Sequence, residues 1–121
     1  MLNTLTVKTN PALFQESLEL LLAELKTHFR ESLKLVVLYG SVARGDYDDD
    51  SDIDILVVID TLEERYKLTP ALTDIANSLF EKYDLWFSIL SETLEYHLKY
   101  RDLLPFHRNV FNEGRILYGK L

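Results

Sequence analysis

The sequence contains no cysteine, which excludes a disulfide framework and any thiolate metal site. It has no internal repeat and no low-complexity linker. No apolar run approaches the roughly 18 residues that a membrane-spanning helix needs. Residues 1–10 lack the basic start and apolar core of a signal peptide. We therefore expect a cytoplasmic protein.

Basic residues are also scarce. The chain has 13 Lys and Arg against 20 Asp and Glu, a net charge of -7. A non-specific nucleic-acid binder would need a basic surface to meet the phosphates, so we expect no direct nucleic-acid partner. The length of 121 residues and the hydrophobic fraction of 47% fit one globular domain over residues 1–121.

Helical and strand-like segments alternate along the chain. Asn10 followed by Pro11 predicts the start of an amphipathic helix that ends near Arg30. Pro105 breaks or restarts a later helix, and Gly114 closes it. The remaining predicted elements are strands over 33–39, 53–59 and 85–90, a main helix from 69–70 to about 80, a helix from Glu92 capped by Ser91, and a short strand over 115–118.

This alternation predicts a small α/β fold, a two-layer sandwich with a mixed β-sheet and helices on one side. The pattern does not give the direction of the strands. A fold of this size is expected to leave one sheet face open for a site or a partner.

Gly40 and Ser41 follow a predicted buried strand. Glycine allows a tight turn and a close approach of phosphate, and the start of a helix at Ser41 would present backbone N–H groups to an anion. Such a pair is usually a plain turn, so it carries little weight alone.

Asp52 and Asp54 are two apart on a predicted strand, which places both carboxylates on one face and Ile53 on the other. Two carboxylates on one face repel each other unless a cation lies between them. Magnesium prefers such oxygen ligands together with substrate phosphates. Two solvated acids at a strand entrance remain the alternative for this pair taken alone.

The joint pattern is more specific than either half. Ten residues separate Gly40-Ser41 from Asp52-x-Asp54, and the full stretch reads GSVARGDYDDDSDIDILV. This stretch resembles the signature of the DNA polymerase β-like nucleotidyltransferase superfamily. It is most similar to the minimal nucleotidyltransferases (MNT) of bacteria and archaea. The segment over 106–118 also resembles the tail of some members.

The resemblance implies roles for these residues. Gly40 and Ser41 would hold the triphosphate, and Arg44 would lie near the phosphates or anchor the loop. Asp52 and Asp54 would ligate magnesium, with two ions expected. Many members add a third carboxylate, as metal ligand or general base, from a later strand. Asp84 is the predicted third acid here, and Ser88 at the family's acidic position is the alternative.

Other polar and aromatic residues receive weaker assignments. The acids Asp46, Asp48, Asp49 and Asp50 are expected to serve loop solvation and turns, with magnesium recruitment as the alternative. Trp86, Tyr83 and Phe87 are expected to pack in the core or against a partner rather than stack on a base. His28, His97 and His107 do not show metal-ligand spacing and receive no catalytic role. His107 and Arg108 are expected to be structural surface residues.

The resemblance also implies a substrate and a partner. MNT proteins are commonly paired with a HEPN protein, an RNase toxin, and the nucleotidyltransferase can silence it by transferring AMP from ATP to a tyrosine. This implies a protein adenylyltransferase that acts as the antitoxin of a toxin–antitoxin pair by AMPylation. Two alternatives stay open: a non-catalytic module that binds HEPN, and an enzyme that acts on a small molecule such as an aminoglycoside.

Overall fold

The structure is a computed structural model that describes residues 10–46, 48, 51–60 and 65–120. The first helix, α2 (Pro11–Phe29), begins where the sequence predicts. The side chain of Asn10 accepts hydrogen bonds from the backbone N–H groups of Ala12 and Leu13, at 3.1 and 3.2 Å. Pro11 occupies the first position, where its missing N–H costs nothing. A short 3-10 helix, η1 (Arg30–Ser32), leads into the sheet.

The four strands of the described chain form one mixed sheet in the order β3-β2-β1-β4. These strands are β1 (Leu33–Tyr39), β2 (Ile53–Ile59), β3 (Phe87–Thr93) and β4 (Arg115–Gly119). β1 pairs antiparallel with β2 and β4, whereas β2 and β3 are parallel. The parallel pair needs a crossover, and α4 (Arg65–Tyr83) supplies it.

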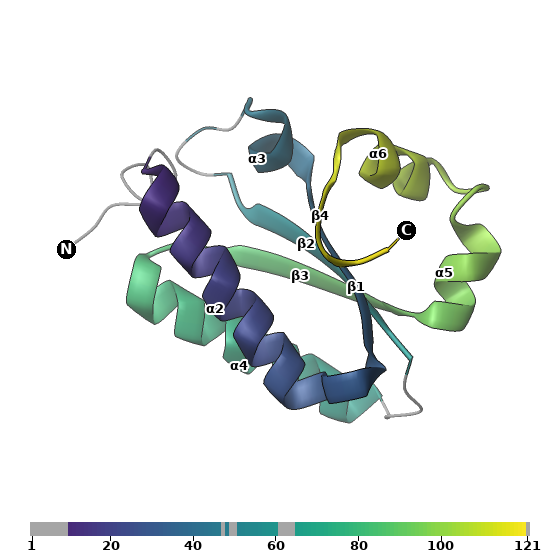
Figure 1. Cartoon of the computed structure of the whole chain (residues 1–121), viewed down its shortest axis with the longest axis horizontal. Coiled ribbons are helices and arrows are strands. Elements are labelled where there is room, and N and C mark those ends of the chain that lie inside the picture. The colour runs from purple at the N-terminus through teal and green to yellow at the C-terminus, as the bar shows by residue number, and fades with distance from the viewer. Residues whose placement is uncertain (1–9, 47, 49–50, 61–64, 121) are drawn as a thin grey trace.

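The two long helices, α2 and α4, lie together on one face of the sheet (Figure 1). Their apolar stripes meet alternate residues of the strands, and these side chains form the larger core cluster. On β2 the residues of this cluster are Ile53, Ile55, Val57 and Ile59. The remaining alternate positions of the same strand, beginning with Asp54, therefore face the opposite side.

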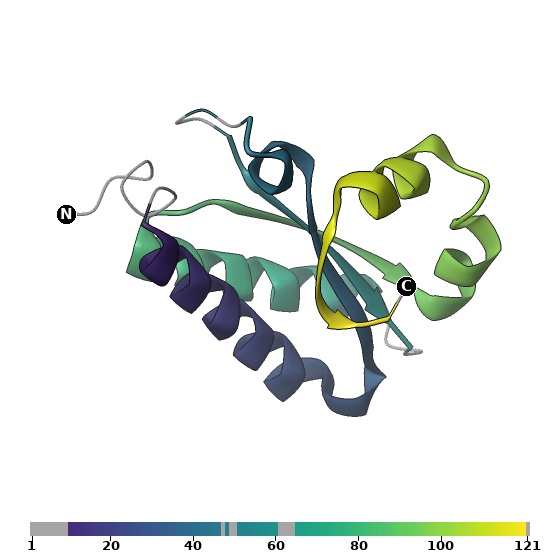
Figure 2. The same ribbon diagram turned by 45° about the horizontal axis from the view of Figure 1, so that its top comes forward.

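The opposite face is partly covered by α5 (Leu94–Tyr100) and α6 (Pro105–Glu113), as Figure 2 shows. The predicted α/β fold with a mixed sheet is confirmed. The expectation that the helices lie on one side of the sheet holds for the long helices α2 and α4, whereas α5 and α6 lie on the other side. The strands bring apolar residues to this second face too, and Val110 of α6 packs on them, so α5 and α6 have a surface to cover. The strand residues of this smaller core cluster are Leu35, Val37, Leu56 and Val58.

Three element boundaries differ from the sequence prediction. α4 begins five residues before Pro70, so the proline lies inside the helix, where it removes one backbone hydrogen bond, rather than at the start of the helix. β3 starts and ends later than expected, and Ser91 lies inside it rather than capping a helix. Thr93 is the residue that caps α5, accepting a hydrogen bond from the N–H of Tyr96 at 3.1 Å. Thr61 and Glu64, whose spacing is that of a possible capping box, lie outside the described residues.

Helix α6 and strand β4 agree with the prediction: Pro105 starts the helix, Gly114 ends it, and the strand follows. Within the described residues, none of the helices combines the length and apolar character that crossing a membrane requires.

Candidate active site

The candidate site lies where β1 ends and β2 begins. β1 runs into the short helix α3 (Gly40–Arg44), whose first residue, Gly40, has a positive φ of 79°. Tyr39 at the end of β1 pairs with Asp54 on β2, so the antiparallel register brings the turn back to the two predicted carboxylates. Sequence positions 40 and 54 are thus neighbours in space.

Gly40 and Asp54 are in direct contact. A Cβ atom on Gly40 would overlap Oδ2 of Asp54 and would lie 3.1 Å from its Cγ. Only glycine meets both demands of this position, the positive φ and the missing Cβ. The contact fixes the Asp54 carboxylate at the base of the turn, beside Ser41, a half-buried residue in the first turn of α3.

Asp52 and Asp54 share one side of their strand segment, as predicted, because Ile53 between them is fully buried in the core cluster beneath α2 and α4. Asp52 is exposed and Asp54 is half-buried. Burial raises the pKa of the Asp54 carboxyl, and the negative charge of Asp52 raises it further, whereas Arg44 opposes this shift. A second negative charge is therefore unfavourable here without a cation.

This donor set fits magnesium. Two carboxylates on one face supply hard oxygen ligands. Burial and the charge of Asp52 raise the pKa of Asp54 despite the opposing charge of Arg44, so a cation bound here would relieve an unfavourable negative charge. Asp52 remains open to solvent and to a phosphate-bound ion. Asp52 and Asp54 are accordingly the residues that would hold the metal.

The structure does not bring Asp84 beside Asp54. In the parallel register, the β3 residue opposite Asp54 is Ser88, and Phe87 pairs with Ile53. Asp84 precedes the strand, at the end of α4, with a left-handed φ of 57°. Four positions of chain separate it from Ser88, roughly 13 Å if extended. The geometry therefore places Ser88, the alternative, where a third carboxylate was expected.

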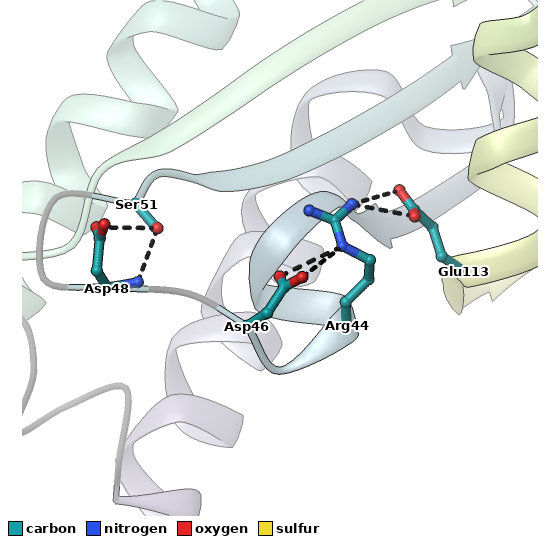
Figure 3. A network of polar contacts seen from close by, with 5 residues as sticks. All are labelled: Arg44, Asp46, Asp48, Ser51 and Glu113. Atoms are coloured by element: carbon teal, nitrogen blue, oxygen red, sulfur yellow. Dashed lines mark hydrogen bonds and ion pairs between the residues drawn. The ribbon is translucent and has the colours of Figure 1, made fainter.

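Arg44 is held between two carboxylates (Figure 3). Its Nε donates to both oxygens of Asp46, at 3.1 and 3.3 Å, and its Nη1 donates to both oxygens of Glu113, at 3.0 and 3.1 Å. These contacts raise the pKa of Arg44. The arginine thus ties α3 to the end of α6.

Glu113 was not identified from the sequence. Its side chain is 23% exposed, it binds Arg44, and its charge also raises the pKa of Asp54. It therefore belongs to the electrostatic surroundings of the site. The neighbouring Gly114 predicted that a helix ends here. It did not indicate the contact with Arg44, because 69 residues separate Glu113 from Arg44 in the sequence.

The acidic loop shows the expected turn chemistry where it is described. The backbone N–H of Asp48 donates to Oγ of Ser51 at 3.0 Å, and this hydroxyl donates to Oδ1 of Asp48 at 3.2 Å (Figure 3). Asp46 binds Arg44 in the same way, so two of the four loop acids have local side-chain partners. Asp49 and Asp50 lie outside the described residues.

Two of the three aromatic residues near β3 pack in the core, as expected, and the third does not. Tyr83 and Phe87 are buried in the core. Trp86 is 51% exposed and stacks on Phe80 of α4, with ring centroids 4.2 Å apart. Trp86 therefore packs on α4 with one side and leaves about half of its surface open.

Two expectations for the histidines were wrong: His97 and His107 do lie close together, and His107 is buried. His97 and His107 are both buried and both contact Glu92, so they form a cluster whose ligand atoms lie within 4.8 Å of one another. His107 is therefore not a surface residue, although the neighbouring Arg108 is exposed. The three positions come from β3, α5 and α6, and sequence spacing did not show that these elements converge.

A glycine turn packs on the half-buried carboxylate of Asp54, Asp52 lies two residues before it, and the charge of Arg44 acts on Asp54. This arrangement is compatible with an enzyme that transfers nucleotidyl groups. The chain belongs to the family described as the nucleotidyltransferase domain, whose profile matches residues 18–118. It is a nucleotidyltransferase, as the sequence motif indicated.

Two curated relatives come from Methanocaldococcus jannaschii, and both carry the name "putative protein adenylyltransferase". One is 40% identical over 94 residues, which cover 78% of this chain and 87% of the relative. The other is 38% identical over 68 residues, or 54% of this chain and 65% of the relative.

Solved toxin–antitoxin complexes contain similar folds. A chain of the complex between the tri-AMPylated Shewanella oneidensis HEPN toxin and its MNT antitoxin is 20% identical, with a TM-score of 0.54 over 88% of this chain and 72% of that one. A chain of a toxin–antitoxin complex with AMP-PNP is also 20% identical, with a TM-score of 0.55 over 83% and 72%. At this identity the likeness shows the fold alone.

Proposed function

We propose that this nucleotidyltransferase is a magnesium-dependent protein adenylyltransferase that moves AMP from ATP to a tyrosine hydroxyl of a HEPN RNase toxin and acts as its antitoxin. The observation that carries the proposal is the contact between Gly40 and the half-buried Asp54 carboxylate. It joins the phosphate-binding half of the motif to the metal-binding half. The names of the two curated relatives support adenylyl transfer, and the solved complexes support the HEPN partner.

In this proposal Asp52 and Asp54 would hold two magnesium ions. Bound magnesium would neutralise the negative charge on the phosphates during transfer. The turn at Gly40 and Ser41 receives the triphosphate through its backbone N–H groups and the serine hydroxyl. Arg44 leaves one or both carboxylates to meet the phosphates, which compensate it with their own negative charge.

The acceptor hydroxyl attacks the α-phosphorus, the bond to the bridging oxygen breaks, and pyrophosphate leaves. Positioning and electrostatic stabilisation supply most of the rate, as in phosphoryl transfer generally. Because Ser88 and not an acid lies beside Asp54 on β3, the two strand carboxylates are the bases nearest the reacting atoms in our proposal. The proton of the acceptor hydroxyl would pass to one of these carboxylates or to a basic side chain of the acceptor protein.

The test is mass spectrometry of a candidate HEPN partner after incubation with this protein, ATP and magnesium. We expect the partner to gain whole AMP units on tyrosine. Asp54→Asn should reduce transfer at least about 1,000-fold, because several kcal/mol of metal-derived stabilisation are lost at about 1.4 kcal/mol per tenfold. Asp60→Asn, the same change at an exposed acid just after β2, is the matched control and should leave the rate unchanged.

Other outcomes would favour the alternatives. A stable complex with HEPN but no added mass would indicate a binding-only antitoxin. Pyrophosphate release with hydroxylated small molecules, and none with HEPN, would indicate a small-molecule enzyme. Either result would overturn protein adenylyl transfer.

A further inference from the structure

A second cluster of ligand-type side chains lies on the same sheet face as Asp54 but further along β3. In the parallel pairing of β2 with β3, Ser88 lies opposite Asp54 and Glu92 lies opposite Val58. Glu92 is therefore four residues along the strand from the candidate active site. At about 3.3 Å per residue this is a separation of roughly 13 Å. The cluster is therefore separate from the magnesium ligands.

Three elements build this cluster. Glu92 is near the end of β3, and Thr93 then caps α5, which brings His97 back over the strand end one turn later. Helix α6 starts at Pro105 and presents His107 from its first turn. Both imidazoles are 2% exposed, and the Glu92 side chain is 9% exposed.

Both imidazoles point a nitrogen at the same carboxylate. Nδ1 of His97 lies 2.9 Å from Oε1 of Glu92. Nε2 of His107 lies 3.0 Å from Oε1 and 2.9 Å from Oε2. Ligand atoms of a tetrahedral zinc ion lie about 3.4 Å apart, given bonds of about 2.1 Å. Opening the cluster by about half an ångström would admit such an ion.

Hydrogen bonding alone compensates this burial poorly. The outer nitrogens, Nε2 of His97 and Nδ1 of His107, are buried and have no hydrogen-bond partner within the part of the chain that the structure describes. A buried carboxylate and two buried, half-satisfied rings are together costly. Those outer nitrogens stay unpaired with or without an ion, and metal–ligand bonds are much stronger than the two hydrogen bonds they would replace.

A route to the cluster exists. A pocket of about 460 Å³ is lined by Glu92 and His107 together with the apolar side chains of Leu56, Leu90 and Phe106. It gives an ion a way in and leaves a fourth position for water or another ligand, as zinc sites with three protein ligands do.

We propose that Glu92, His97 and His107 form a zinc(II) site that holds α5 and α6 on the sheet. The ligand set selects the metal: imidazole nitrogens suit zinc and its transition-metal neighbours, whereas magnesium prefers oxygen. The proposal does not rest on the transferase function, and neither one's failure would decide the other.

The test is a titration of tag-free, chelator-treated protein with zinc chloride against a chromophoric competitor. We expect one tight ion per chain with a dissociation constant at or below about a micromolar. His107→Gln and His97→Gln should weaken it at least about 100-fold. The matched control is His28→Gln, because His28 is exposed and distant in the fold, and it should not change the affinity. The double variant Asp52→Asn/Asp54→Asn should keep the site.

The absence of a stoichiometric tight ion, or an equal loss with His28→Gln, would overturn the proposal and leave a histidine–carboxylate network. Should the histidine variants fail to fold, cobalt(II) added to the unmodified protein decides the matter. The intense visible absorption of four-coordinate cobalt with nitrogen and oxygen ligands supports the site. The absence of this absorption refutes the site.

Discussion

The Cα atom of Gly40 lies against the carboxylate of Asp54, with no space between them for a side chain. The turn that begins at Gly40 and the strand that carries Asp54 are therefore in close contact, and the contact leaves no room for a Cβ atom. A change at residue 40 acts on the position of residue 54 even though 14 positions separate them in sequence.

The first prediction tests this contact. Gly40→Ala should destabilise the fold by at least about 2 kcal/mol, because a positive φ disfavours alanine and its Cβ would displace Asp54. Nucleotide and magnesium binding should weaken with it, as measured by calorimetry. Gly45→Ala is the matched control: φ there is 86°, but nothing lies near the new Cβ. Equal effects of the two changes on magnesium binding would show that backbone strain, and not the contact, matters.

The second prediction concerns pH. The pKa of Asp54 is raised in the folded, metal-free protein. The folded state then binds the proton more tightly than the unfolded state, so stability falls as pH rises from the unfolded pKa, near 4, through the folded one. Asp54→Asn should therefore raise the melting temperature in chelator at pH 7 by up to about 4 °C and lose this advantage below pH 4.

Magnesium provides the control for that experiment. Saturating ion should stabilise the wild type and leave Asp54→Asn unaffected, which would reverse their order. A wild type that is already the more stable protein in chelator would contradict the proposed charge repulsion.

The third prediction decides the identity of the third site residue on β3. Asp84→Asn removes the charge while tolerating the left-handed φ, and transfer should stay within about threefold of wild type. Ser88→Asp places a carboxylate opposite Asp54 and should tighten magnesium binding about tenfold. A hundredfold loss of transfer in Asp84→Asn would restore Asp84 as the third acid.

The fourth prediction concerns the ion pairs of Arg44. Glu113→Gln should shift the melting temperature by no more than about 2 °C, because exposed ion pairs contribute little to stability. Arg44→Ala should raise KM for ATP about tenfold through a lost phosphate contact. Arg108→Ala, at an exposed arginine on α6, is the control and should leave KM unchanged. An unchanged KM in Arg44→Ala would restrict Arg44 to anchoring the loop.

The parts of the fold that sequence predicted well are those with an unambiguous local signal. β1 and β2 are apolar runs closed by Gly40 and by the acidic loop, and their bounds agree with the prediction. The bounds of β3 lie later in the chain than predicted because pairing with β2 determines where this strand ends. β2 continues to Ile59, which pairs with Thr93, so polar residues near Thr93 belong to the strand. Local propensity does not show such pairing.

The site divides in the same way. The sequence motif has a fixed spacing, which allowed its residues to be identified as one group from the sequence; they are Gly40, Ser41, Asp52 and Asp54. The contacts of Glu113 and of the Glu92 cluster depend on how α5 and α6 fold onto the sheet. No periodicity within one helix or strand encodes that docking.

Helix α6 is nine residues long, about 13 Å, and it makes a polar side-chain contact at each end. His107 in its first turn joins the Glu92 cluster, and Glu113, its last residue, holds Arg44. A ligand that displaces one end of so short a rod also moves the other. In that case the two sites are coupled by thermodynamic linkage. A nucleotide that draws Arg44 away from Glu113 changes the affinity of the Glu92 cluster for an ion, and the ion changes the affinity for the nucleotide by the same factor.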